Sequence, residues 1–101
     1  MKLVIISSSQ LKTPPDNYGG LELICYYLAR ELAKKSHEIY LVATKGSKAD
    51  GYELIETIEP QTGVFEDWRA RDERAYKIWR PKVEEILDDE TVLIDHSWYK
   101  Y

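Results

Sequence analysis

The sequence predicts an α/β domain with a Rossmann-like open sheet of about four parallel strands, flanked by helices. Three observations support this fold class. Short apolar runs rich in β-branched residues recur along the chain, longer segments with helical spacing lie between them, and 101 residues suit a single domain covering residues 1–101. The predicted order is strand, helix, strand, strand, helix, strand. Strands that alternate with helices in this way form parallel sheets.

Four segments have the pattern of strands. Residues 2–7 (KLVIIS) are a continuous apolar run, as in a parallel strand that is buried on both faces. Residues 38–44 (EIYLVAT) are a second apolar strand, and residues 91–95 (TVLID) are a further one. Residues 52–58 (YELIETI) alternate polar and apolar side chains, which also favours a strand.

The first helix is predicted over residues 20–35. Apolar residues recur there at steps of three and four, so they share one face of a helix. These residues are Leu21, Ile24, Cys25, Leu28 and Leu32. We expect this face to pack against the sheet.

The second helix is predicted over residues 66–89. One stripe of this segment holds Trp68, Ala75, Trp79, Val83 and Ile86. An aromatic stripe at helical spacing is usually core, so both tryptophans are expected to be buried. Pro81 interrupts the segment and predicts a kink or two separate helices. The run at residues 69–74 (RARDER) has mixed sign and is predicted to be a solvated face.

Composition limits the function classes. The net charge is −4 with no block of Lys or Arg, which argues against nucleic-acid binding. Cys25 is the single cysteine, which excludes an internal disulfide and a multi-cysteine metal site. The apolar run at residues 3–6 is far too short for a signal sequence or a membrane span. The expected compartment is the cytoplasm, with peripheral association of a complete enzyme with a membrane left open.

Ligands of open parallel sheets bind beyond the carboxyl ends of the strands. The segment that follows the first strand carries Gly19 and Gly20 where it enters the first helix. Glycines there allow a ligand to approach the backbone, and the N–H groups of a first helical turn favour an anion such as a diphosphate. The alternative is that the pair only lets the chain turn into the helix. Neither the dinucleotide fingerprint G-x-G-x-x-G nor a P-loop sequence is present.

Three stretches resemble family 4 glycosyltransferases, which have the GT-B fold. Residues 14–22 (PPDNYGGLE) are similar to the family segment P-P-x-x-Y-G-G-x-E. Residues 28–32 (LAREL) and 35–39 (KSHEI) resemble its L-A-x-x-L and G-H-E-V, with Ser36 in place of the usual glycine. Residues 95–98 (DHSW) resemble the segment after its fourth strand.

The resemblance implies the acceptor-side, N-terminal part of a retaining enzyme that transfers a sugar from a nucleotide-sugar co-substrate. It implies no cofactor and no metal requirement. The backbone of Gly19 and Gly20 would face the donor diphosphate, and His96 would project toward the acceptor sugar as the candidate catalytic residue. Glu22 would lie in the first helical turn, where a structural role in favouring the helix dipole is the preferred interpretation. His37 would lie at the opposite edge of the sheet with a structural role.

Two departures from the family pattern affect activity. Ile94 stands where many members have a second histidine. The donor-binding domain, with its paired glutamates and basic residues, has no counterpart within these residues, so the isolated chain is expected to be inactive. Retaining transfer depends mainly on stabilising the leaving diphosphate.

Two other interpretations stay open. The chain could be a non-catalytic α/β module that binds an anion weakly or pairs with a partner, or a nucleotide-binding, flavodoxin-like domain without a recognisable phosphate loop. The aromatics Trp98, Tyr99 and Tyr101 beside an unfinished sheet suggest that a following helix or a second copy of the chain covers them. A homodimer through the sheet edge and these aromatics is therefore a further expectation.

Overall fold

The computed structural model describes residues 1–10, 13, 20–35, 37–60 and 67–97, and its elements follow the predicted order. They are β1 (Lys2–Ile6), α1 (Gly20–Lys34), β2 (Glu38–Ala43), β3 (Glu53–Glu56), α2 (Trp68–Ile86) and β4 (Thr91–Asp95). The α/β class with a Rossmann-like open sheet is confirmed. None of the described helices has the length and apolar character to cross a membrane.

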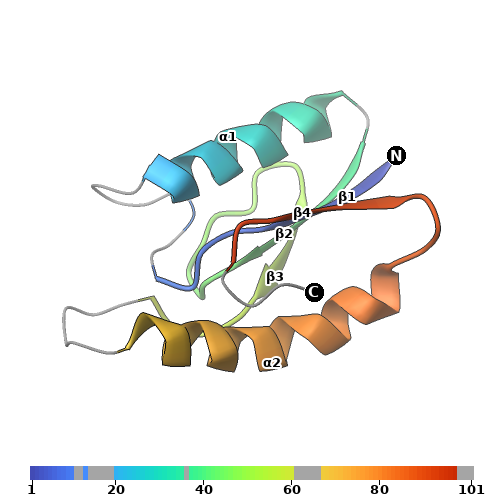
Figure 1. The fold of residues 1–101 in the computed structure, drawn as a ribbon. Coiled ribbons are helices and arrows are strands. Elements are labelled where there is room, and N and C mark those ends of the chain that lie inside the picture. Colours follow the sequence, from blue (N-terminus) through green and yellow to red (C-terminus); the bar gives the residue numbers. More distant parts are fainter. Residues whose placement is uncertain (11–12, 14–19, 36, 61–66, 98–101) are drawn as a thin grey trace.

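The four strands form one parallel sheet in the order β3-β2-β1-β4. The helix α1 covers one face of this sheet and α2 covers the other (Figure 1). The chain moves outward from β1 to β2 and β3, and then returns to the other side of β1 to form β4. This reversal makes the junction between β1 and β4 a topological switch point, where open α/β sheets hold their ligands.

The centre of the sheet is buried on both faces because β1 lies between two strands and between two helices. Leu3 and Ile5 pack toward α1, whereas Val4 and Ile6 pack toward α2. Each of these four side chains is at most 7% exposed. Alternate residues of a strand point to opposite faces, so a continuous apolar run is what a doubly covered strand requires.

The buried face of α1 differs from the predicted one. Cys25 is buried as expected, but Leu21 is 37% exposed and Ile24 is 61% exposed, so that part of the prediction was wrong. Tyr26 is buried instead, and its hydroxyl donates a hydrogen bond of 2.7 Å to Asp50. The helix is thus rotated so that Tyr26, whose hydroxyl has a partner in the segment after β2, faces the sheet in place of Ile24.

The helix α2 runs from Trp68 to Ile86 as one helix that includes Pro81, so of the two expected alternatives, a kink or two separate helices, the second is excluded. The side chain of Pro81 lies on the exposed surface of the helix. The carbonyl group that loses its hydrogen bond to the proline can therefore be hydrated, which lowers the cost of proline in the helix interior. At the start of α2, the carboxylate of Asp67 caps the helix by accepting a hydrogen bond of 3.0 Å from the Arg69 amide.

The inward side of α2 confirms part of the predicted stripe and corrects the rest. Trp79 and Val83 are fully buried, as predicted, whereas Trp68 is 44% exposed and is not a core residue. The mixed-charge run at residues 69–74 is not a uniformly solvated face, because Arg71 and Asp72 are buried. Both of these buried charged residues have partners in segments that are distant in sequence.

Candidate functional site

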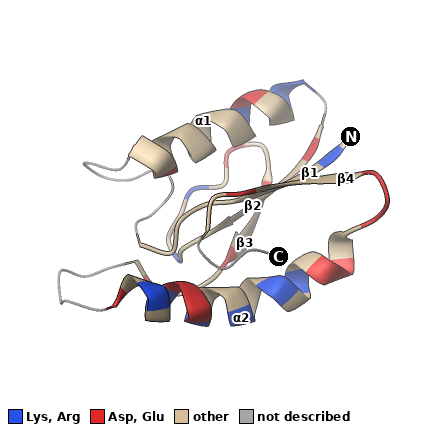
Figure 2. Cartoon of the chain, in the orientation of Figure 1, with Lys and Arg blue, Asp and Glu red and all other residues tan. Residues whose placement is uncertain are grey.

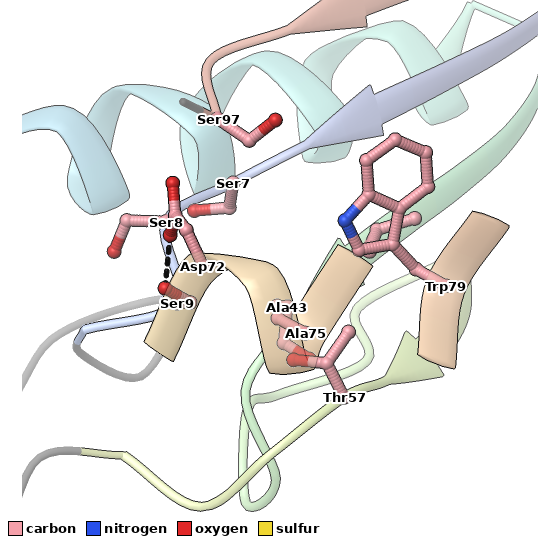
Figure 3. Close-up of a pocket in the computed structure, with 10 residues that line it drawn as sticks. Ser7, Ser8, Ser9, Ala43, Thr57, Asp72, Ala75, Trp79 and Ser97 are labelled. Atoms are coloured by element: carbon pink, nitrogen blue, oxygen red, sulfur yellow. Dashed lines mark hydrogen bonds between the residues drawn. The ribbon is translucent and has the colours of Figure 1, made fainter. Parts of the chain in front are cut away.

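A pocket of about 300 Å³ lies beyond the carboxyl ends of β1 and β4, at the switch point of the sheet. Its described lining comes from the segments after both strands and from the first turns of α2. These residues are Ser8, Gln10, Trp68, Asp72, His96 and Ser97. A smaller cavity beneath it extends toward Trp79 and Thr57 and shares Ser8, Asp72 and Ser97 with the larger pocket (Figure 3).

Three consecutive serines after β1 fix the floor of this site. The Ser7 hydroxyl lies 2.8 Å from the Thr13 hydroxyl. The Ser8 hydroxyl donates a hydrogen bond to the carboxylate of Glu22. The Ser9 hydroxyl donates one to the carboxylate of Asp72 (Figure 3). The end of β1 is therefore bound to α1 on one face of the sheet and to α2 on the other.

The backbone of the same segment is held by a buried guanidinium group. Arg71 is 4% exposed, and it donates a hydrogen bond of 2.8 Å to the Ser9 carbonyl oxygen and another to the Glu59 carbonyl oxygen. A guanidinium group presents several donors in a rigid plane, which suits it to bridge two carbonyl groups. This arrangement joins α2 to the segments after β1 and β3.

The residues after β4 form the opposite wall. The His96 amide donates a hydrogen bond of 3.0 Å to the Ile6 carbonyl oxygen, which continues the pairing of β4 with β1 by one residue. The carboxylate of Asp95 accepts hydrogen bonds from the Ser97 amide and hydroxyl, at 2.8 Å and 2.5 Å. His96 itself is exposed and lines the pocket, as expected for a residue at the end of the fourth strand.

The predicted phosphate site at the start of α1 is only partly described. Gly20 is the first residue of α1, whereas Gly19 lies outside the described residues, as does Ser36. A Cβ atom built at Gly20 would meet no atom within 4 Å, so no described contact requires a glycine there. Glu22 is 6% exposed in the same first turn and accepts a hydrogen bond from the Ser8 hydroxyl, while its role in favouring the helix dipole stays a prediction.

Two other predicted residues lie away from the pocket. His37 immediately precedes β2, at the amino ends of the strands and therefore on the edge of the sheet opposite the pocket. Cys25 is fully buried in α1, and burial raises the pKa of its thiol. A buried thiol with a raised pKa is a poor nucleophile.

The sequence did not single out Ser8, Gln10, Trp68, Asp72 or Ser97 as site residues. The segments after the first and fourth strands were placed at the ligand-binding edge of the sheet, but only Gly19, Gly20 and His96 in them were assigned to a site. Two of the five residues belong to a helix that was assigned to packing and solvent. A useful signal was the spacing of four between Trp68 and Asp72, because residues four apart share a face of a helix.

The charges around the site have no single sign. Basic and acidic residues are mixed along α2 (Figure 2). The strands carry one basic and four acidic residues, which are Lys2, Glu38, Glu53, Glu56 and Asp95. Within residues 1–10, 13, 20–35, 37–60 and 67–97, no group of three or more His, Cys, Asp or Glu side chains could hold a metal ion.

Comparison of the chain with models of protein families, with curated proteins and with solved structures found no match.

Proposed function

We propose that this chain is the acceptor-side, N-terminal segment of a retaining GT-B glycosyltransferase that uses a nucleotide-sugar donor. The proposal combines the sequence resemblance with the position of the pocket. The isolated chain is expected to be inactive, because the groups that stabilise a leaving diphosphate belong to a separate donor-binding domain in enzymes of this kind.

The pocket at the switch point is the observation that carries the proposal. Its described lining offers two hydroxyl groups, an amide, an imidazole and a carboxylate, together with the indole of Trp68. The polar groups can donate to or accept from sugar hydroxyl groups. An indole face is electron-rich, so it suits the weakly positive C–H groups on one face of a sugar ring.

In this proposal His96 is the residue closest in role to a catalytic group. It stands at the mouth of the pocket from the end of β4, where its imidazole can hydrogen-bond an acceptor hydroxyl group. The donor diphosphate would lie against the first turn of α1, where Gly20 leaves open space beside the backbone.

The donor side can be tested at Gly20 with two variants of equal size, Gly20→Glu and Gly20→Gln. Both side chains enter open space, and a glutamate in the first turn is compatible with the helix dipole, so both variants should fold. We expect saturation-transfer NMR to detect weak binding of uridine, guanosine or adenosine diphosphate to the wild-type chain. Binding should fall several-fold further in Gly20→Glu than in Gly20→Gln, since only the former adds a negative charge.

Equal nucleotide binding by the two variants, or no nucleotide binding by the wild type, would contradict the proposal that the first turn of α1 binds the diphosphate of the sugar donor. The chain would then be better described as the non-catalytic α/β module that the sequence also allows. A transfer assay with the isolated chain and labelled nucleotide sugars should show no product, and turnover by the isolated chain would contradict the assignment to a partial enzyme.

A further inference from the structure

The first half of α1 carries a cluster of exposed apolar side chains on its outer face, which we call the apolar patch. Its members are Leu21, Leu23, Ile24 and Tyr27, and Ile24 is the most exposed of them at 61%. Single exposed apolar residues are ordinary on a protein surface, but these four fall within seven consecutive positions. Exposed patches of this kind mark surfaces that contact a membrane or another protein.

The second half of the same helix and the residue after it are mainly basic (Figure 2). Arg30, Lys34 and Lys35 carry positive charges there, and Glu31 is the one acidic residue among them. The Glu31 carboxylate lies 3.1 Å from the Lys34 ammonium group, so it offsets one of the three positive charges. Glu22, the other acidic residue of α1, is buried. The exposed part of α1 is therefore positive, although the chain has a net charge of −4.

The apolar patch and the basic side chains lie on the same side of the helix. Tyr27 and Lys34 are seven residues apart, and Ile24 and Lys35 are eleven residues apart. Both spacings bring a side chain back to nearly the same direction in a helix of 3.6 residues per turn. The outer face of α1 thus changes along its length from apolar to basic.

A lipid surface fits this face better than a protein does. A stable protein interface takes about 20–30 residues from each partner, whereas the apolar patch has four. Two copies that met through this face about a two-fold axis would also bring two positive surfaces together. A helix that lies in a membrane interface needs only one apolar face, and its basic side chains are attracted by anionic lipid headgroups.

We infer that the outer face of α1 docks onto the surface of an anionic lipid bilayer, with the apolar patch entering the interface and the basic side chains facing the headgroups. This docking goes beyond the proposed function and does not depend on it. The patch lies at the same end of the sheet as the pocket, because Glu22 in the first turn of α1 accepts a hydrogen bond from Ser8, which lines the pocket. In the proposed enzyme this position suits an acceptor carried by a membrane lipid, a consequence that rests on the proposed function.

Vesicle flotation tests the docking with two kinds of vesicle. One is made of phosphatidylcholine alone, and the other contains about 30% phosphatidylglycerol. We expect the chain to bind the anionic vesicles at least about five-fold more strongly, because basic side chains are attracted to their surface. Sodium chloride at about 0.5 M should weaken the binding by screening this attraction.

The apolar part of the face is tested by Ile24→Ser, which should lower the affinity for anionic vesicles at least about five-fold. The matched control is Ile78→Ser on α2, where the side chain is 36% exposed, and it should leave the affinity unchanged. Both substitutions change exposed side chains, so both variants should unfold at nearly the temperature of the wild type.

The basic part is tested by Lys34→Gln combined with Lys35→Gln. This double variant should narrow the preference for anionic vesicles to about two-fold or less, because two charges that face the headgroups are removed. Lys77→Gln combined with Lys82→Gln removes the same charge from the exposed surface of α2 and should keep the wild-type preference.

No binding to vesicles, no preference for anionic ones, or equal losses in Ile24→Ser and Ile78→Ser would overturn the inference. Self-association that Ile24→Ser abolishes, without vesicle binding, would overturn it too and make the patch a contact between copies of the chain. The nucleotide experiment separates this result from the proposed function. Vesicle binding without nucleotide binding would support the docking and contradict the enzyme, whereas the reverse would leave an enzyme that does not dock through α1.

Discussion

The Ser9 hydroxyl donates a hydrogen bond to the Asp72 carboxylate across 63 positions of sequence, and both residues are buried. Ser9 follows β1 and Asp72 lies in the second turn of α2, so this bond joins the two segments at the smaller cavity, which both residues line. Arg71, the neighbour of Asp72, holds the carbonyl group of the same serine. The shape of the site therefore depends on α2 being docked in this register.

The first prediction concerns this bond. Asp72→Ala should lower the free energy of unfolding by about 1.5–3 kcal/mol, because a hydrogen bond to a charged group is lost and the buried Ser9 hydroxyl loses its acceptor. Asp72→Asn should cost less, since an amide oxygen can still accept. Guanidinium unfolding of the single variants and of the double variant with Ser9→Ala would give the coupling energy. A coupling energy near zero would show that the two side chains do not stabilise each other in solution.

The second prediction compares two tryptophans of the same helix. Trp79 is 2% exposed, so Trp79→Ala should cost about 3–5 kcal/mol, while Trp68→Ala should cost less than about 1 kcal/mol because that side chain is 44% exposed. Chemical denaturation of both variants would test this difference. Similar losses in the two variants would mean that α2 packs with a different face toward the sheet.

The third prediction concerns alkaline pH. Burial raises the pKa of Tyr52 to about 12, from a usual value of 10.0, and its hydroxyl donates a hydrogen bond of 2.5 Å to the Lys48 carbonyl oxygen. The folded state keeps the phenol protonated after the unfolded chain has begun to lose that proton. The protonated phenol therefore adds to the free energy of unfolding in full below about pH 10, and this stabilisation is lost as the pH rises through about 12.

Urea unfolding between about pH 9 and pH 12 would reveal this contribution as a fall in stability. Tyr52→Phe should flatten part of the fall, because phenylalanine has no proton to lose. Tyr27→Phe is the matched control, since Tyr27 is 47% exposed on the neighbouring surface of α1. An identical pH profile for wild type and Tyr52→Phe would contradict the raised pKa.

The fourth prediction concerns the edge of the sheet. The His96 amide points toward β1. Because successive residues of a strand point their backbone N–H and C=O groups to opposite sides, those of Leu93 point away from β1. Val92 is 42% exposed on the α1 side of this edge. Antiparallel pairing of two copies about Leu93 would set Val92 opposite Ile94 of the second copy, and no two carboxylates would face each other directly within Thr91–Asp95.

We therefore expect concentration-dependent dimerisation in sedimentation velocity experiments. Val92→Lys should shift the chain toward the monomer, because an edge lysine opposes strand pairing. Ile78→Lys on α2, where the side chain is 36% exposed, should leave the association unchanged. A wild-type chain that stays monomeric at millimolar concentration would contradict the prediction of a homodimer. The expected contribution of Trp98, Tyr99 and Tyr101 lies outside the described residues.

The regular elements could be predicted because their signals are local. The apolar run at residues 2–7 contains β1, and the spacing of Ala75, Trp79 and Val83 identified the inner side of α2. His96 could be placed beyond the end of a strand because parallel strands end at a common edge of the sheet. These inferences need only the sequence of one segment and the spacing at which side chains return to the same face of a helix or strand.

Other features depend on contacts between distant segments. Spacing alone could not decide that Tyr26 would be buried in place of Ile24, because Asp50, which binds the Tyr26 hydroxyl, lies beyond β2. Likewise, Arg71 and Asp72 belong to a run that resembles a solvated surface until the carbonyl and hydroxyl groups of Ser9 are brought against it.

The sequence by itself determined the order of the elements along the chain, the burial of the first strand on both faces and the edge of the sheet at which His96 stands. Only the tertiary structure decided which charged residues are buried and which tryptophan lines the pocket. The physical reason is that a buried charge is tolerated only where its partners are positioned to meet it, and those partners are supplied by distant parts of the chain.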